Sequence, residues 1–279
     1  MTGSWPRRLL HNRRARLGLL LIGLLTAAAV LSPVIAPYDP TEHLDLLNKR
    51  LLAPSFEHLM GTDFYSRDLL SRVLYGARIS LAIAFLSILV SVTIGTAVGM
   101  VAGYLGGMVD GVLMRLVDAA LAIPRVFLLL VILALWNRVG VIGMVTVLGL
   151  SSWFGTTRIV RAEALSLRQR DFVVAARSLG LGKVRILLRH LLPNAIAPVI
   201  VTATLGIGQI ILIEAGLSYL GVGVQEPTPS LGRMIRDGYE QIANAPWISI
   251  FPGLVIVLTV VGFSLLGDGL RRTLDPQSR

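Results

Sequence analysis

Uncharged apolar runs are the feature that most restricts the fold of this chain. A helix needs about 20 predominantly apolar residues to cross the hydrocarbon core of a bilayer. Four segments meet that need without one charged side chain: 17–36, 79–103, 139–157 and 248–267. Only 15% of the 279 residues are charged, whereas soluble domains carry about 25%. The sequence therefore predicts an all-α integral membrane protein.

Two further segments are long enough to span a membrane but carry ionisable side chains. They are 111–136, with Arg115, Asp118 and Arg125, and 194–221, with Glu214. Ionisable groups within a bilayer usually face protein or water, so both segments count as spans. We therefore expect six transmembrane helices, with both termini on one side.

Basic residues predict which side that is. Segment 158–192 holds eight Lys and Arg against Glu163 and Asp171, and positive charge marks the cytoplasmic side. Arginines also cluster before the first span, at positions 7, 8, 13, 14 and 16. Both termini are therefore expected in the cytoplasm. The net charge is +10, and the basic residues cluster between the apolar runs. This distribution is typical of charges that orient a membrane protein and does not favour nucleic-acid binding.

An alternative treats 17–36 as the core of a cleaved signal peptide, since a basic start precedes it and three alanines lie within it. Its length exceeds the short apolar core of such signals. Its removal would leave five spans and put 158–192 on the wrong side. We therefore expect a retained span.

Catalytic and metal-binding chemistry lacks the residues that it needs. The chain has no cysteine and four histidines, so no disulfide or Cys/His metal cluster can form, and we expect no cofactor. A phosphate-binding loop requires G-x-x-x-x-G-K-[ST], and the nearest segment, 180–184, lacks that spacing and the hydroxyl. One alternative, a membrane-embedded enzyme, would need a convergent set of reactive groups, but the spans offer no His, Cys or carboxylate pair. A second alternative, a secondary transporter, would need several ionisable groups near mid-membrane and inverted repeats, but only Glu214 and Arg125 are candidates and no clear repeat is present.

Glycine recurs every fourth residue from Gly95 to Gly111. Positions four apart share one helix face, so another backbone can approach this stripe closely. Packing within the chain is favoured over a contact between subunits.

The basic segment 158–192 contains two candidate helices. Asp171 is a suitable N-cap and Gly180 a suitable C′ residue for a helix of about two turns. A basic amphipathic helix then runs over 183–192 and is expected to end at Pro193. Such a pair can lie on lipid headgroups or dock a soluble partner.

The same segment resembles the signature loop of ABC importer permeases. Ala175, Ala176, Gly180 and the pair Leu192–Pro193 stand at the spacing of that motif. This sequence has Val174 where the family has Glu and His190 where it has Ile, so any bond from that carboxylate is lost.

The resemblance covers nearly the whole chain. Segments 58–81, 114–124, 217–235 and 265–276 look like the dipeptide, oligopeptide and nickel importer permeases, of the second-permease or C type. Ser66 stands where a Gly is usual.

The resemblance implies a non-catalytic subunit with the type I importer permease fold. Its partners would be a homologous second permease, two ATPase subunits that bind ATP and Mg, and an extracytoplasmic substrate-binding protein. Peptide is the implied substrate, with nickel or glutathione as alternatives. The loop would form a coupling helix that contacts the ATPase through Asp171, Val174, Ala175, Ala176, Arg177, Ser178, Leu179 and Gly180.

On this interpretation the chain has five parts. They are a cytoplasmic segment 1–16, the first transmembrane helix 17–36, an outer loop 37–78, the permease core 79–267 with its coupling loop, and a cytoplasmic tail 268–279.

Charged residues outside the loop have two interpretations each. Glu214 and Arg125 are candidates for the translocation path or a gate. Glu214 could instead tie two helices together, and Arg125 could bind a peptide carboxylate or pair with Asp118. In the outer loop, Asp63, Arg67 and Asp68 could contact the binding protein, but ion pairs that hold the loop together are favoured.

Overall fold

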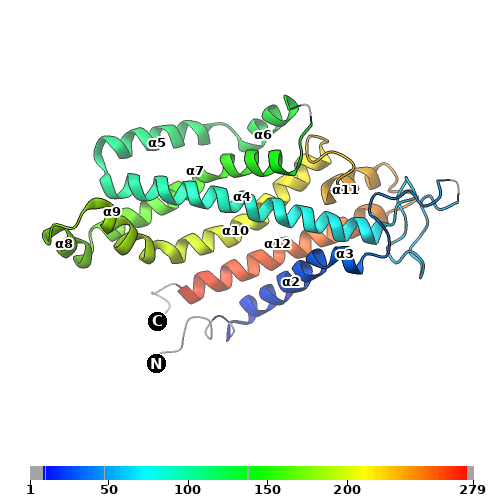
Figure 1. The fold of residues 1–279 in the computed structure, drawn as a ribbon, viewed down its shortest axis with the longest axis horizontal. Coiled ribbons are helices and arrows are strands. Elements are labelled where there is room, and N and C mark those ends of the chain that lie inside the picture. The colour runs from blue at the N-terminus through cyan, green and yellow to red at the C-terminus, as the bar shows by residue number, and fades with distance from the viewer. Residues whose placement is uncertain (1–8, 10, 47, 137, 275–279) are drawn as a thin grey trace.

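Helices dominate the residues that the structure describes, which are 9, 11–46, 48–136 and 138–274. The structure is a computed structural model. Most of its long helices lie along the long axis of the molecule (Figure 1). The helices are α2 (Arg13–Val30), α3 (Ser32–Ile35), α4 (Leu69–Leu105), α5 (Gly107–Ala122), α6 (Arg125–Ala134), α7 (Val141–Arg168), α8 (Asp171–Ser178), α9 (Lys183–Ile186), a π-helical turn (Leu187–Leu191), α10 (Leu192–Tyr219), α11 (Leu231–Tyr239) and α12 (Trp247–Leu274).

Three helices extend well beyond the apolar runs that predicted them. α4 begins at Leu69 because the Asp68 carboxylate caps it, accepting a hydrogen bond from the Ser71 N–H at 2.8 Å. α7 continues to Arg168 and α12 to Leu274. The first ten helical residues of α4 thus lie in the segment expected as outer loop, because backbone hydrogen bonding continues through polar residues where apolar composition ends.

Length and apolar composition qualify three helices of the described residues to cross a membrane: α4, the continuous helix 183–219, and α12. α5 and α6 qualify together as one broken span, bent by 77°. The break falls at Ile123 and Pro124, the two residues between the helices, since proline favours an extended residue before it and Ile123 is extended. α2 and α7 occupy the other two expected spans. The count of six spans stays a prediction.

The expectation that the helix over 183–192 ends at Pro193 is wrong. The helix continues to Tyr219 through the π-helical turn Leu187–Leu191. Proline has no N–H to donate to the carbonyl four residues earlier, and its ring crowds that carbonyl. A wider turn relieves this conflict. The carbonyl four residues before Pro193 belongs to Arg189. The Asn194 side chain donates to the neighbouring carbonyl of His190 at 2.6 Å.

Close packing of α4 against α7 forms the most extensive helix pair. Gly95, Gly99 and Gly103 of α4 pack directly against α7. A Cβ atom at Gly99 would stand 2.7 Å from the Thr157 carbonyl oxygen. The stripe ends at the turn into α5, and a Cβ at Gly111 would meet nothing within 4 Å. Packing within the chain is therefore the role of the first three glycines.

The two ends of the molecule differ in what they carry. α8 and α9 lie at one end, together with the beginning of α2 and the end of α12, whereas α11 and the loop before α4 lie at the other (Figure 1). α2 packs along α12, where Gly18 touches the backbone of Gly262 and Leu266. The expected cytoplasmic segment 1–16 and tail 268–279 lie partly outside the described residues.

Gly99→Ala tests the packing of α4 on α7. The added methyl would overlap the α7 backbone, so we expect the free energy of unfolding to fall by about 1–3 kcal/mol. Thermal and denaturant unfolding of the purified subunit in detergent measures this. Gly111→Ala is the matched control and should leave stability unchanged or slightly higher, since alanine is the better helix former. Equal effects of both substitutions would contradict the packing.

Candidate functional site

α8 is held to the bundle by one face and leaves the other uncovered. Val173 and Ala176 are buried in a small core with Ala164, Leu167 and Ile186. Around the uncovered surface of α8, Phe172, Val174 and the C-cap residue Leu179 are exposed by 41%, 50% and 80%. Asp171, Ala175, Arg177 and Ser178 are exposed as well. The uncovered surface of α8 is therefore mixed, and Val174 adds an apolar side chain at the position where the resemblance has Glu.

The ends of α8 follow the sequence closely. Gly180 has φ of +74°, and its N–H bonds the Arg177 carbonyl while the N–H of Leu181 bonds the Ala176 carbonyl. This pair of bonds is the Schellman motif, which needs a left-handed residue, so the expected role of Gly180 is confirmed. The N-cap is Arg170, not Asp171. Asp171 lies in the first turn, where a carboxylate favours the helix dipole.

One of the two alanines in the expected docking face points the other way. Ala176 is only 4% exposed and packs against the bundle, whereas Ala175 is exposed. Residues 173 and 176 lie one helical turn apart and share the buried face. The small side chain at 176 therefore serves packing within this chain.

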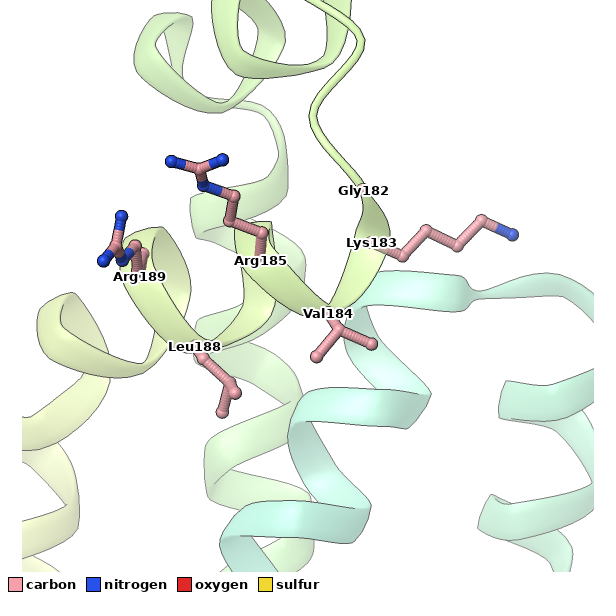
Figure 2. A pocket seen from close by; sticks show the side chains of 6 residues that line it. All are labelled: Gly182, Lys183, Val184, Arg185, Leu188 and Arg189. Atoms are coloured by element: carbon pink, nitrogen blue, oxygen red, sulfur yellow. The ribbon is translucent and has the colours of Figure 1, made fainter.

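A basic groove lies beside α8. It has a volume of about 950 Å³ and is lined by Gly182, Lys183, Val184, Arg185, Leu188 and Arg189. Figure 2 shows Arg185 and Arg189 on one side of the segment and Val184 and Leu188 on the other. This is the amphipathic pattern expected for 183–192, at the end of the continuous helix that leads into α10.

Arg125 lies at a cavity of about 320 Å³ that is bordered by α4, α5, α7 and α10. Its guanidinium donates to the Ser152 hydroxyl at 2.5 Å and to the Leu148 carbonyl at 3.4 Å. Its Nε is buried without a partner. The expected pairing with Asp118 is wrong, because the bend at Pro124 separates the two side chains. Asp118 pairs instead with Arg158 at 2.5 Å.

A second cavity, of about 620 Å³, continues from the first toward the end of the molecule that carries α8. The two cavities share three lining residues, Ile159, Thr202 and Leu205. The larger one reaches Glu163, Asn194 and Arg271. Together they form a groove along α7 and α10. No sequence motif pointed to this groove, because its polar residues are scattered singly through apolar runs.

Glu214 is completely buried and bonded to three serines. Its carboxylate contacts Ser80 at 2.8 Å, Ser218 at 2.9 Å and Ser230 at 3.2 Å. These serines belong to α4, α10 and the residue before α11, so Glu214 ties three segments together. It lines neither of the two cavities. The geometry favours the structural alternative, and the role in a path or gate stays a prediction.

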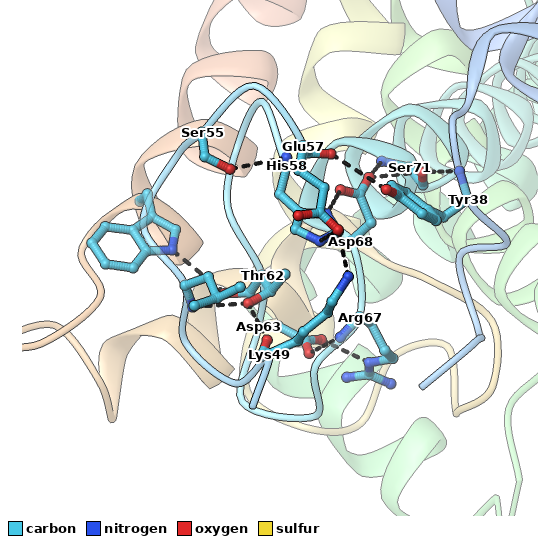
Figure 3. A network of polar contacts seen from close by, with 12 residues as sticks. Tyr38, Lys49, Ser55, Glu57, His58, Thr62, Asp63, Arg67, Asp68 and Ser71 are labelled. Atoms are coloured by element: carbon cyan, nitrogen blue, oxygen red, sulfur yellow. Dashed lines mark hydrogen bonds and ion pairs between the residues drawn. The ribbon is translucent and has the colours of Figure 1, made fainter. Parts of the chain in front are cut away.

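The three charged residues of the outer loop are buried in a polar network (Figure 3). Arg67 donates to Asp63 at 2.7 Å and to Glu226 at 3.3 Å, and Asp68 contacts the His58 ring at 2.9 Å. These contacts favour ion pairs that hold the loop on the bundle. Contact with a binding protein stays a prediction.

Glu226 lies close to arginines that favour the charged form of its carboxyl group. Partial burial raises the pKa of its carboxyl group, but Arg233 and Arg67 outweigh that effect and hold the pKa below its ordinary value. The carboxylate therefore stays charged and balances Arg67 across a long sequence separation.

Comparison with known proteins agrees with this architecture. Residues 95–279 match the family of binding-protein-dependent transport system inner membrane components, and residues 4–54 match the N-terminal TM domain of oligopeptide transport permease C. The dipeptide transport system permease protein DppC of Alkalihalophilus pseudofirmus is 39% identical, over 98% of this chain and 89% of its own.

Two further relatives are similar to the chain to the same degree. The di/tripeptide transport system permease protein DppC of Pseudomonas aeruginosa is 40% identical, over 96% of this chain and 89% of its own. The glutathione transport system permease protein GsiD of Escherichia coli is 38% identical, over 97% and 89%.

The chain therefore belongs to the family of binding-protein-dependent transport system inner membrane components. It is a permease subunit of an ABC importer, and the resemblance to the C-type permeases is confirmed. The chain has the all-α membrane fold of the type I importer permeases and is a multi-pass protein of the inner membrane.

Ser66→Gly tests the backbone of the outer loop. Ser66 has φ of +60°, and its buried hydroxyl has no partner, which explains why glycine suits this position. Relief of the left-handed strain should raise the free energy of unfolding by about 1 kcal/mol. Ser55→Gly is the control and should lower it, because the Ser55 hydroxyl accepts a bond from the His58 N–H at 3.2 Å. Thermal unfolding in detergent distinguishes the two, and a loss of stability in Ser66→Gly would refute the strain.

Proposed function

We propose that this subunit forms half of the pathway of an ATP-driven peptide importer and is coupled to separate ATPase subunits through α8. The observation that carries the proposal is that the uncovered surface around α8 exposes the large apolar side chains of Phe172, Val174 and Leu179 outside the apolar spans. Clustered exposed apolar side chains mark an interaction surface. The opposite face fastens α8 to the bundle, so a force on α8 reaches the membrane helices.

The orientation follows from the charges and the arrangement of the ends. α8, the basic groove, the beginning of α2 and the end of α12 share one end of the molecule. Positive charge favours the cytoplasm for that end, which supports the proposal that both termini are cytoplasmic. The ATPase subunits bind ATP and Mg on this side. A homologous second permease completes the pathway, and a substrate-binding protein docks at the opposite end.

Peptides are the proposed substrates because relatives named for dipeptide and di/tripeptide transport align over nearly the whole chain. Glutathione, itself a tripeptide, is the second candidate, because a permease named for it is 38% identical. Nickel import is a further alternative. Uptake of each compound by the reconstituted importer, with its own binding protein, separates the three.

Ala175→Arg tests docking at α8. Ala175 is exposed, so the folding of the subunit should be unaffected, but the bulky charged side chain would hold an ATPase off the surface. We expect at least a tenfold loss of the ATPase subunits that copurify with the permease. ATP-driven uptake should fall in parallel.

The matched control is Ala53→Arg, the same substitution at an exposed alanine at the opposite end of the molecule. It should retain the ATPase subunits at the wild-type level. Full retention in Ala175→Arg, with the subunit present at normal abundance, would exclude α8 as the coupling surface.

A further inference from the structure

We propose that Arg125 binds the carboxylate of the transported peptide in the cavity between α4, α5, α7 and α10. This inference rests on the proposed peptide import and assigns a residue of this chain to the substrate. The cavity volume of about 320 Å³ lies at the lower end of the range typical of ligand sites, about 300–1,000 Å³.

Arg125 carries a positive charge that lacks a counter-ion among the described residues. Among the described residues, no carboxylate forms an ion pair with it, and its contacts are a hydroxyl and a carbonyl, both through Nη2. A guanidinium has five N–H donors, and the buried Nε has no partner. An unpaired charge within a membrane span is costly. An anionic ligand would supply the missing counter-ion, and carboxylate matches the planar guanidinium fork.

The remaining lining of the cavity suits a peptide. Ser151, Ser152 and Gln209 offer neutral hydrogen-bonding groups for an amide, whereas Ile88, Leu121 and Ile210 form apolar walls. A small set of polar groups among apolar side chains is the usual make-up of a ligand site.

The cavity also has an exit. It shares Ile159, Thr202 and Leu205 with the larger cavity of about 620 Å³ that reaches Asn194 and Arg271 near the α8 end. A peptide released from Arg125 can therefore move along α7 and α10 toward the cytoplasmic end. Arg271 and Glu163 both line that route, so a cation there is accompanied by a carboxylate.

Two rival roles for Arg125 make distinct predictions. If it were a structural clamp between α6 and α7, its loss would lower stability. If it paired with a carboxylate of the second permease, its loss would weaken the permease pair and would be indifferent to the chemistry of the substrate.

The experiment uses the complete importer, reconstituted with its binding protein. The probe is a dipeptide of alanine and the photoreactive amino acid photoleucine, supplied as the free acid and as its C-terminal amide. Crosslinks are located by mass spectrometry, and ATP-driven uptake of the free acid is measured in parallel. The variants are Arg125→Gln, Arg125→Lys and the control Arg115→Gln, an exposed arginine on α5 that lines neither cavity.

We expect the free acid to crosslink to residues that line the cavity. Arg125→Gln should reduce this labelling about tenfold or more, as for loss of a charged hydrogen bond. Arg125→Lys should retain most of it and Arg115→Gln all of it, and the amide should label weakly. The melting temperature of Arg125→Gln should be unchanged or higher, since an unpaired charge is removed.

Several outcomes would overturn the proposal. They are labelling outside the cavity or none at all, equal labelling by acid and amide, equal labelling in Arg125→Gln, or a lower melting temperature or dissociation of the permease pair in that variant. Absence of dipeptide uptake by the wild-type importer would instead refute peptide import itself, which distinguishes the two failures.

Discussion

The close approach of α4 and α7 is the contact on which the rest of the structure depends. Three glycines allow the two backbones to touch, and a methyl group at Gly99 would already collide with a carbonyl of α7. The outer loop leads directly into α4, and α8 follows directly after α7. One helix pair therefore holds the network around Asp68 at one end and the exposed surface around Val174 at the other.

Glu214 and Arg125 are both ionisable residues within helices, but they differ in how many of their polar atoms have hydrogen-bond partners. Glu214 has three serine partners and lines neither cavity. Arg125 faces a cavity and leaves its Nε without a partner. A satisfied group of this kind stabilises a packed core, whereas an unsatisfied one beside a cavity indicates a ligand. From sequence alone the two residues looked equivalent.

The sequence was sufficient for the features that depend on local chemistry. The positions of the main helices follow from apolar runs, and the end of α8 follows from Gly180, since a left-handed residue is needed there. It was insufficient where tertiary contacts decide. Ala176 was expected to face a partner, but it lies on the buried face of α8. The bend at Pro124 separates Arg125 from Asp118. A π-helical turn lets the helix continue through Pro193. The groove along α7 and α10 has no local signature, because helices distant in sequence build it.

The passage of the helix through Pro193 has a mechanical consequence. Residues 183–219 form one continuous helix that begins beside α8 and runs past the groove, to which it contributes a wall. A push on its tip beside α8 would be transmitted along the helix. Backbone hydrogen bonding changes from the α-helical to the π-helical pattern at the turn Leu187–Leu191. A rotation of the tip would therefore either be taken up at this turn or be transmitted through it to α10.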